Sequence, residues 1–182
     1  MIKHLLPLTL AAAVALPLTF PVLGAAERTE TTTTTTTTAL NKDDVKFLQM
    51  ANQCGLMEIK TSELLAKRNV TGPVADFAKK MITEHTAVNK EMTALASKKG
   101  VTLPTALDEN SQKKYDSLAK NDDAKMSEEY MECQIKEHKA AVSIFKDAAE
   151  DSKDADVKAI AAKHLPHMQA HLDESKRIED TL

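Results

Sequence analysis

The chain has 182 residues, of which 28% are charged and 3% aromatic, and its formal net charge is −3 at pH 7. This mild acidity, without a basic stripe or interleaved aromatic side chains, argues against a nucleic-acid-binding protein. Ala, Leu, Lys, Glu and Met abound, Gly is scarce and Trp is absent. Since no run of alternating β-branched residues occurs either, the composition predicts an all-α protein.

Residues 1–26 are predicted to be a secretory signal peptide. A short polar start precedes an Ala- and Leu-rich run over residues 5–23, and small residues follow that suit cleavage after Ala26. A retained membrane anchor is the alternative, but three prolines in the run suit a spanning helix poorly. No later stretch is apolar for long enough to cross a bilayer. We therefore expect an exported, periplasmic protein without a transmembrane segment in its mature form.

Residues 27–41 are predicted to be a disordered tether. Thr31–Thr38 is an unbroken threonine run, which offers no apolar group to bury. The remaining residues, 42–182, are about the right number for a single domain.

That domain carries four long amphipathic segments, each of which predicts a helix. The expected ranges are 43–69, 73–99, 123–151 and 155–178. The pattern is clearest in the second helix, where inward-facing residues recur in steps of three or four: Val74, Phe77, Met81, His85, Val88, Met92 and Leu95. In the first helix the expected apolar stripe consists of fewer residues: Val45, Leu48, Leu56, Ile59 and Leu65. Pro166 lies inside the fourth helix and is expected to bend it.

The connection over residues 101–122 is too long for a hairpin and includes a predicted short helix at 110–120. Two short turns and one long middle connection predict a four-helix bundle with a crossover, in which the second and third long helices run the same way. A simple up-down-up-down bundle is the alternative topology.

Each long helix carries one metal-capable side chain near its middle: Glu58, His85, His138 and His171. Helices packed side by side would bring these four groups into one central layer, whichever way each helix runs. Imidazole and carboxylate are common ligands of Fe, Zn, Mn and Cu ions. The layer therefore predicts a site for one transition-metal ion, with room for water.

A two-iron oxidase is disfavoured by the same residues. Di-iron bundles need more carboxylates, with a Glu three residues before a His on two helices. Here Ile82, Ile135 and Met168 occupy the positions three before the central histidines. Glu84 and Glu137 each precede a histidine directly, and are expected to flank the layer or face solvent rather than act as co-ligands.

A purely structural core is the competing interpretation of this layer, because a histidine on an apolar helical face is often simply hydrogen-bonded. A second cluster, His164 and His167 with His171, shares one side of the fourth helix. It could bind a metal at the surface, but we favour the interpretation that His164 and His167 are partly exposed.

Cys54 and Cys133 leave two inferences in conflict. An even cysteine count in an exported protein favours a disulfide. The crossover topology would instead make the first and third long helices antiparallel. It would then separate the two cysteines by about 13 Å along the bundle axis, beyond disulfide reach. The bridge therefore stays open.

Several segments resemble a bacterial family of exported proteins, the domain-of-unknown-function family numbered 4142. They are residues 44–58, residues 77–85, Tyr130-Met131 with His138, and Leu165-Pro166 with His171-Leu172. The resemblance implies a ferritin-like fold with the crossover and brings no established activity. Members are often labelled outer-membrane proteins, whereas this chain is expected to be periplasmic. The family's usual Asp and Met are replaced here by Glu84 and Gln134, and the two cysteines lie outside its pattern.

Two function classes remain. The first is a periplasmic metal-binding bundle, acting in metal storage, buffering or oxidative-stress defence. The second is a non-catalytic envelope protein that responds to stress or binds a protein partner, which the sequence does not identify. A hydrolytic or redox enzyme ranks last, because no nucleophile elbow, phosphate loop or dinucleotide motif is present.

Overall fold

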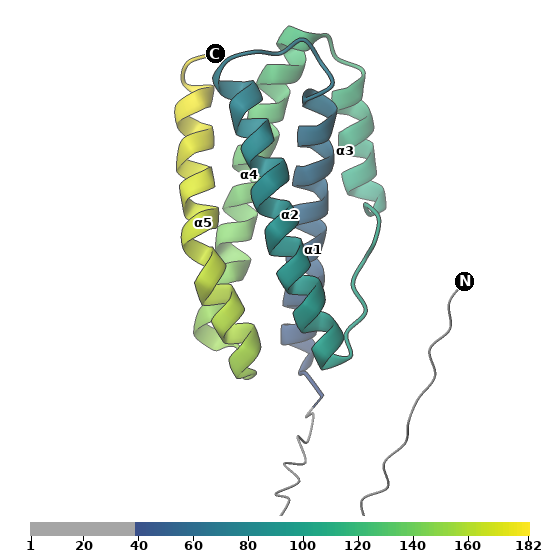
Figure 1. Cartoon of the computed structure of the whole chain (residues 1–182), viewed down its shortest axis with the longest axis vertical. Coiled ribbons are helices and arrows are strands. Elements are labelled where there is room, and N and C mark those ends of the chain that lie inside the picture. Colours follow the sequence, from purple (N-terminus) through teal and green to yellow (C-terminus); the bar gives the residue numbers. More distant parts are fainter. Residues whose placement is uncertain (1–38) are drawn as a thin grey trace, which may run out of the picture. The chain divides into compact units, whose positions relative to one another are not determined.

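The computed structural model describes residues 39–182, which form a helical bundle (Figure 1). Its elements are α1 (Lys42–Leu65), α2 (Pro73–Lys99), α3 (Glu109–Ala119), α4 (Asp123–Asp151) and α5 (Ala155–Glu179). These described residues contain no strand, so the all-α prediction is confirmed. The predicted signal peptide and most of the predicted tether lie outside the described residues.

The four long helices are joined by a crossover. Helices α1 and α2 form one hairpin and α4 and α5 another, while the connection with α3 returns along the bundle beside α1 and α4 (Figure 1). As a result α2 and α4 run in the same direction and α1 and α4 in opposite directions. The ferritin-like bundle with a crossover helix is thus confirmed, and the simple up-down-up-down alternative is wrong.

Helix ends follow local chemistry. Asp108, Asp122 and Asp154 each cap the helix that follows, because the side chain accepts a hydrogen bond from a backbone N–H of the first turn. Gly100 ends α2 in the left-handed conformation with φ 70°, which glycine adopts without strain. Helix α1 stops at Leu65, four residues before the expected end, because its last turn tightens into i to i−3 hydrogen bonds.

The apolar core is divided into two clusters by a layer of polar side chains. One cluster lies near the end of the bundle where α1 begins, and its largest members are Phe47, Leu48, Met92, Phe145 and Met168. The other lies near the opposite end, with Leu65, Phe77, Met81, Met126, Tyr130 and Ile178. On every long helix, the predicted metal-capable residue falls between the two clusters along the sequence.

The predicted apolar stripe of α1 is only partly correct. Leu48 and Leu65 are buried, but Val45, Leu56 and Ile59 are half-buried at its edge. The face that α1 buries instead contains several polar residues: Asp44, Asn52, Glu58, Thr61 and Ser62. Tertiary hydrogen bonds compensate the burial of these residues other than Glu58, and a hydrophobic pattern does not detect such bonds.

Helix α5 continues through Pro166 without interruption. Within residues 39–182, no helix combines the length and the apolar character that crossing a membrane requires.

Candidate metal centre

Four side chains from four helices meet at the polar layer. Glu58 comes from α1, His85 from α2, His138 from α4 and His171 from α5. Their exposed fractions are 0%, 3%, 0% and 1% respectively. The structure therefore brings together all four residues that the sequence singled out, and it buries them.

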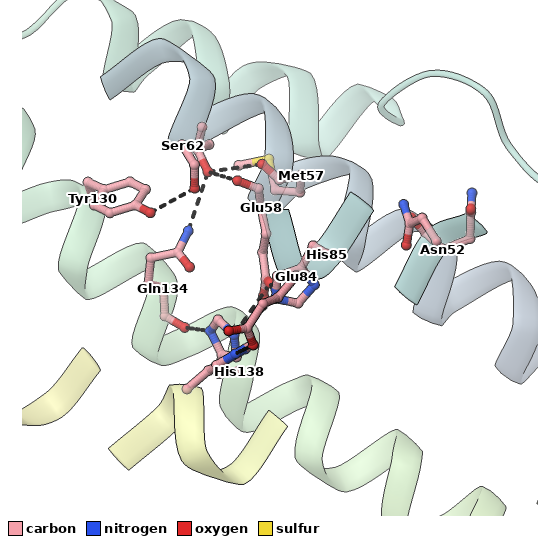
Figure 2. Close-up of polar contacts among 12 residues, drawn as sticks. Asn52, Met57, Glu58, Ser62, Glu84, His85, Tyr130, Gln134 and His138 are labelled. Carbon is pink, nitrogen blue, oxygen red and sulfur yellow. Dashed lines mark hydrogen bonds and ion pairs between the residues drawn. The ribbon is translucent and has the colours of Figure 1, made fainter. Parts of the chain in front are cut away.

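Two imidazoles and the carboxylate converge most closely. The Nε2 atoms of His85 and His138 lie 3.4 Å apart. Glu58 Oε2 lies 3.4 Å from His138 Nε2 and also contacts His85 Nε2 (Figure 2). Two nitrogens bound tetrahedrally to one zinc ion at about 2.0–2.1 Å would be separated by roughly 3.3 Å. The spacing of this histidine pair thus suits one shared ion.

A backbone hydrogen bond fixes the orientation and protonation of His138. Its Nδ1 lies 2.9 Å from the carbonyl oxygen of Gln134 (Figure 2). A carbonyl only accepts, so Nδ1 carries the hydrogen. Burial lowers the pKa of His138, which keeps the ring neutral at pH 7. Nε2 therefore presents a lone pair toward His85 and Glu58, as metal-binding histidines commonly do when their other nitrogen is held by an acceptor.

His171 completes the histidine group. The three ring centroids are separated by 5.2 to 5.4 Å. One ligand atom from each ring lies within 4.8 Å of those of the other two. His171 Nε2 lies 2.7 Å from Glu84 Oε2, so a carboxylate holds that nitrogen. Its Nδ1 is buried and has no hydrogen-bond partner among residues 39–182.

The centre is rich in buried acceptors that lack a donor. Neither oxygen of Glu58 has a regular hydrogen bond within the described residues, although Oε2 contacts His85 Nε2 at ion-pair distance. His171 Nδ1 adds a third unpartnered polar atom. Buried polar groups in folded proteins nearly always have partners, and a bound cation would satisfy these three atoms.

The ionisation of Glu58 matches that role. Burial alone would raise the pKa of this carboxyl, but the adjacent His85 and His138 outweigh burial and hold it below its usual value. Burial lowers the pKa of His171 to about 4. Glu58 is therefore an anion at neutral pH, while burial favours the neutral form of His138 and His171, and these are the ionisation states that metal coordination needs.

Polar side chains of α1 and α4 brace one side of the centre. Ser62 Oγ and Tyr130 Oη are hydrogen-bonded at 2.7 Å, and Gln134 Nε2 donates to Thr61 Oγ1 at 3.4 Å (Figure 2). Since Gln134 also holds His138 through its carbonyl, this network ties the imidazole to both helices. The sequence prediction did not include it.

The two carboxylates next to the central histidines have separate partners. Glu84 points from α2 toward α5 and binds His171, and its side chain is 37% exposed. Glu137 instead binds Lys114 of α3 at 2.6 Å. Their expected flanking positions are therefore correct, whereas the specific pairing of Glu84 with His171 was not anticipated.

His164 differs from its prediction. It was expected to be partly exposed, but it is buried with 5% exposure, and its Nε2 lies 3.0 Å from Glu91 Oε2 on α2. His167 is exposed as expected.

Cys54 and Cys133 are both free, so the structure contains no bridge between them. This agrees with the antiparallel arrangement of α1 and α4.

Residues 29–178 match the family described as Domain of unknown function (DUF4142). The chain belongs to the DUF4142 family. No curated protein matches this DUF4142 chain. Among solved structures, it is similar to the crystal structure of a DUF305 fragment from Deinococcus radiodurans, with a TM-score of 0.71 and 13% sequence identity. The match covers 80% of this chain and 100% of that fragment, and at this identity it shows a shared fold only.

Proposed function

We propose that this DUF4142 protein binds one divalent transition-metal ion between Glu58, His85, His138 and His171, and serves in metal storage or buffering. The observation that carries the proposal is the set of buried, unpartnered acceptors at the point where the four helices meet. Three nitrogens and one carboxylate suit zinc, iron, manganese or copper, and iron or copper would connect the protein to oxidative-stress defence.

The ligand set favours holding an ion over catalysis. Four protein ligands close a tetrahedral zinc site, whereas catalytic zinc sites keep a position open for water. The buried position of all four residues also restricts access of a substrate to the ion. We further propose that the protein acts in the periplasm after export, on the basis of its N-terminal signal-like sequence.

Metal content of the exported, untagged protein tests the proposal. Elemental analysis is expected to find a near-stoichiometric transition metal in the wild type and a strong loss in His85→Ala and His138→Ala. His164→Ala is the matched control, because His164 is also a buried histidine paired with a carboxylate but lies outside the central layer. A wild type without metal, even after incubation with Zn²⁺, Mn²⁺, Fe²⁺ and Cu²⁺, would reject the proposal and favour a structural polar core.

A further inference from the structure

The central residues are connected to the surface through one polar contact. Among the described side-chain contacts of Glu58, His85, His138 and His171, most join these four residues to one another or to the buried Gln134. The exception is the hydrogen bond from His171 to Glu84. Because the Glu84 side chain is 37% exposed, it links solvent directly to a residue of the centre.

Glu84 lies in a seam between α2 and α5 that is bridged by charged side chains. Lys80 binds Glu174 at 2.7 Å on one side of the Glu84–His171 pair. On the other side, Glu91 binds both Lys163 at 2.7 Å and His164 at 3.0 Å. Partly exposed ion pairs contribute only about 0–1 kcal/mol each, so parting them costs far less than opening apolar packing. The α2–α5 seam is thus a side of the bundle that can open at low cost.

A second metal-capable side chain lies on the same side of α5 as His171. His167 is exposed and precedes His171 by four residues on α5, so the two imidazoles lie on one side of the helix. Two histidines at this spacing are a common way for a helix to hold a transition metal. The ring centroid of His167 lies 6.1 Å from that of His164, which pairs with Glu91 in the same seam.

We propose that the metal ion reaches the buried centre through the α2–α5 seam, captured first by Glu84 and His167 and then passed inward by His171. Glu84 supplies the negative charge that attracts a cation, and His167 supplies an exposed nitrogen. His171 is shared by both positions, since it contacts Glu84 and belongs to the central layer. As the ion binds Glu84, it displaces the hydrogen bond that His171 Nε2–H donates to this carboxylate. His171 keeps that proton and binds the ion in the centre through its unprotonated Nδ1. This inference rests on the proposed function.

The rate of metal uptake tests the route separately from the affinity. Purified metal-free protein is mixed with Co²⁺ in a stopped-flow instrument, and the visible absorption of the bound ion gives the second-order association rate. Release into excess chelator gives the dissociation rate. Glu84→Gln preserves size and hydrogen bonding while removing the charge. Glu91→Gln is the matched control, because Glu91 is another α2 carboxylate paired with a histidine of α5.

Glu84→Gln is expected to slow association at least tenfold while the final stoichiometry stays that of the wild type, since a charged funnel raises association rates by about 10–10³. His167→Gln is expected to slow association less than Glu84→Gln does. Glu84→Asp, which keeps the charge, is expected to retain most of the wild-type association rate. Glu91→Gln is expected to leave the association rate within twofold of the wild type. Circular dichroism confirms that each variant is folded.

An unchanged association rate in Glu84→Gln would overturn the route, and if dissociation alone accelerates, Glu84 merely orients His171. In both cases the proposed function stands, because the centre still binds Co²⁺. A wild type that takes up no Co²⁺, and none of the other divalent ions, overturns both proposals.

Discussion

Gly55 on α1 lies directly against the side chain of Asn89 on α2. A methyl group at Gly55 would sit 2.2 Å from Asn89 Oδ1, well inside any normal contact. Asn89 Nδ2 in turn lies 3.4 Å from the carbonyl oxygen of Asn52. The missing side chain at Gly55 therefore allows α1 and α2 to approach closely, one turn of helix from Glu58.

Gly55→Ala is expected to destabilise the protein by about 1–3 kcal/mol, because overpacking at this contact outweighs the gain in helix propensity. In an Asn89→Ala background the same substitution is expected to stabilise by up to about 1 kcal/mol, since only the propensity term remains. Urea unfolding of the wild type, the two single variants and the double variant measures the energetic coupling between positions 55 and 89. Equal effects of Gly55→Ala in both backgrounds would show that Asn89 is not the obstacle.

Tyr130→Phe is expected to cost about 1–3 kcal/mol of unfolding free energy, because it leaves the buried Ser62 hydroxyl without the partner now at 2.7 Å. Tyr115→Phe is the natural control, since Tyr115 is the other tyrosine of the chain and is only half-buried. Chemical denaturation of both variants provides the comparison. Similar losses in the two would contradict a special contribution from the Ser62–Tyr130 pair.

Without metal, the protein is expected to lose stability as the pH falls from about 6.5 toward about 4. Burial lowers the pKa of His171 to about 4, against 6.5 in an unfolded chain. Between these values the unfolded chain binds a proton that the folded chain does not, so acidification favours unfolding. For His171, the loss of unfolding free energy over this pH range is about 3 kcal/mol. Burial also lowers the pKa of His138, which adds to this loss.

Unfolding free energies measured at several pH values between 7 and 4 check this dependence. His171→Gln is expected to flatten the slope, whereas His167→Gln, at an exposed position, should leave it unchanged. A constant free energy of unfolding between pH 7 and pH 5 would contradict the burial of His138 and His171 in the neutral form.

Metal addition is expected to raise the melting temperature, because an ion that binds only the folded state stabilises it. At a free-metal concentration 100 times the Kd the gain is about 2.7 kcal/mol, which corresponds to roughly 10 °C for a domain of this size. Glu58→Gln should lose most of this gain, since it removes the only carboxylate of the central four. Differential scanning calorimetry with and without Zn²⁺ measures both proteins, and an equal shift in the two would exclude Glu58 as a ligand.

Cys54 and Cys133 are expected to remain reduced and to react slowly with thiol reagents. Burial raises the pKa of each thiol to about 12, so very little thiolate is present at pH 7. Titration should find few reactive thiols in the folded protein and two after unfolding. An intact mass two hydrogens lower than that of the reduced chain would reveal a disulfide and contradict the expectation.

Most of the fold could be predicted because each long helix is marked by a local pattern of apolar residues and by residues typical of helix ends. In α2 almost every apolar step is buried, and Pro73 and Gly100 mark its ends. The central layer could also be found, because each of its residues sits near the middle of a long helix, and helix midpoints meet regardless of direction. The length of the connection over residues 101–122 then favoured the crossover.

The parts that were missed depend on contacts between distant segments. Helix α1 buries Asn52, Thr61 and Ser62, whose partners come from other parts of the chain. His164 is buried because Glu91 reaches it from α2, and Glu84 binds His171 for the same reason. Predicting these pairs requires knowing that α2 and α5 are neighbours, and the hydrophobic pattern of a sequence does not show which helices are neighbours.

The crossover also determines how the donor atoms are shared along the chain. The α1–α2 hairpin holds Glu58 and His85, and the α4–α5 hairpin holds His138 and His171. A cut between residues 101 and 108 would leave each fragment with half of the set, too few to retain an ion tightly. Two fragments produced together would therefore have to associate in order to bind the ion tightly. Removal of the metal would then weaken the association of the two fragments.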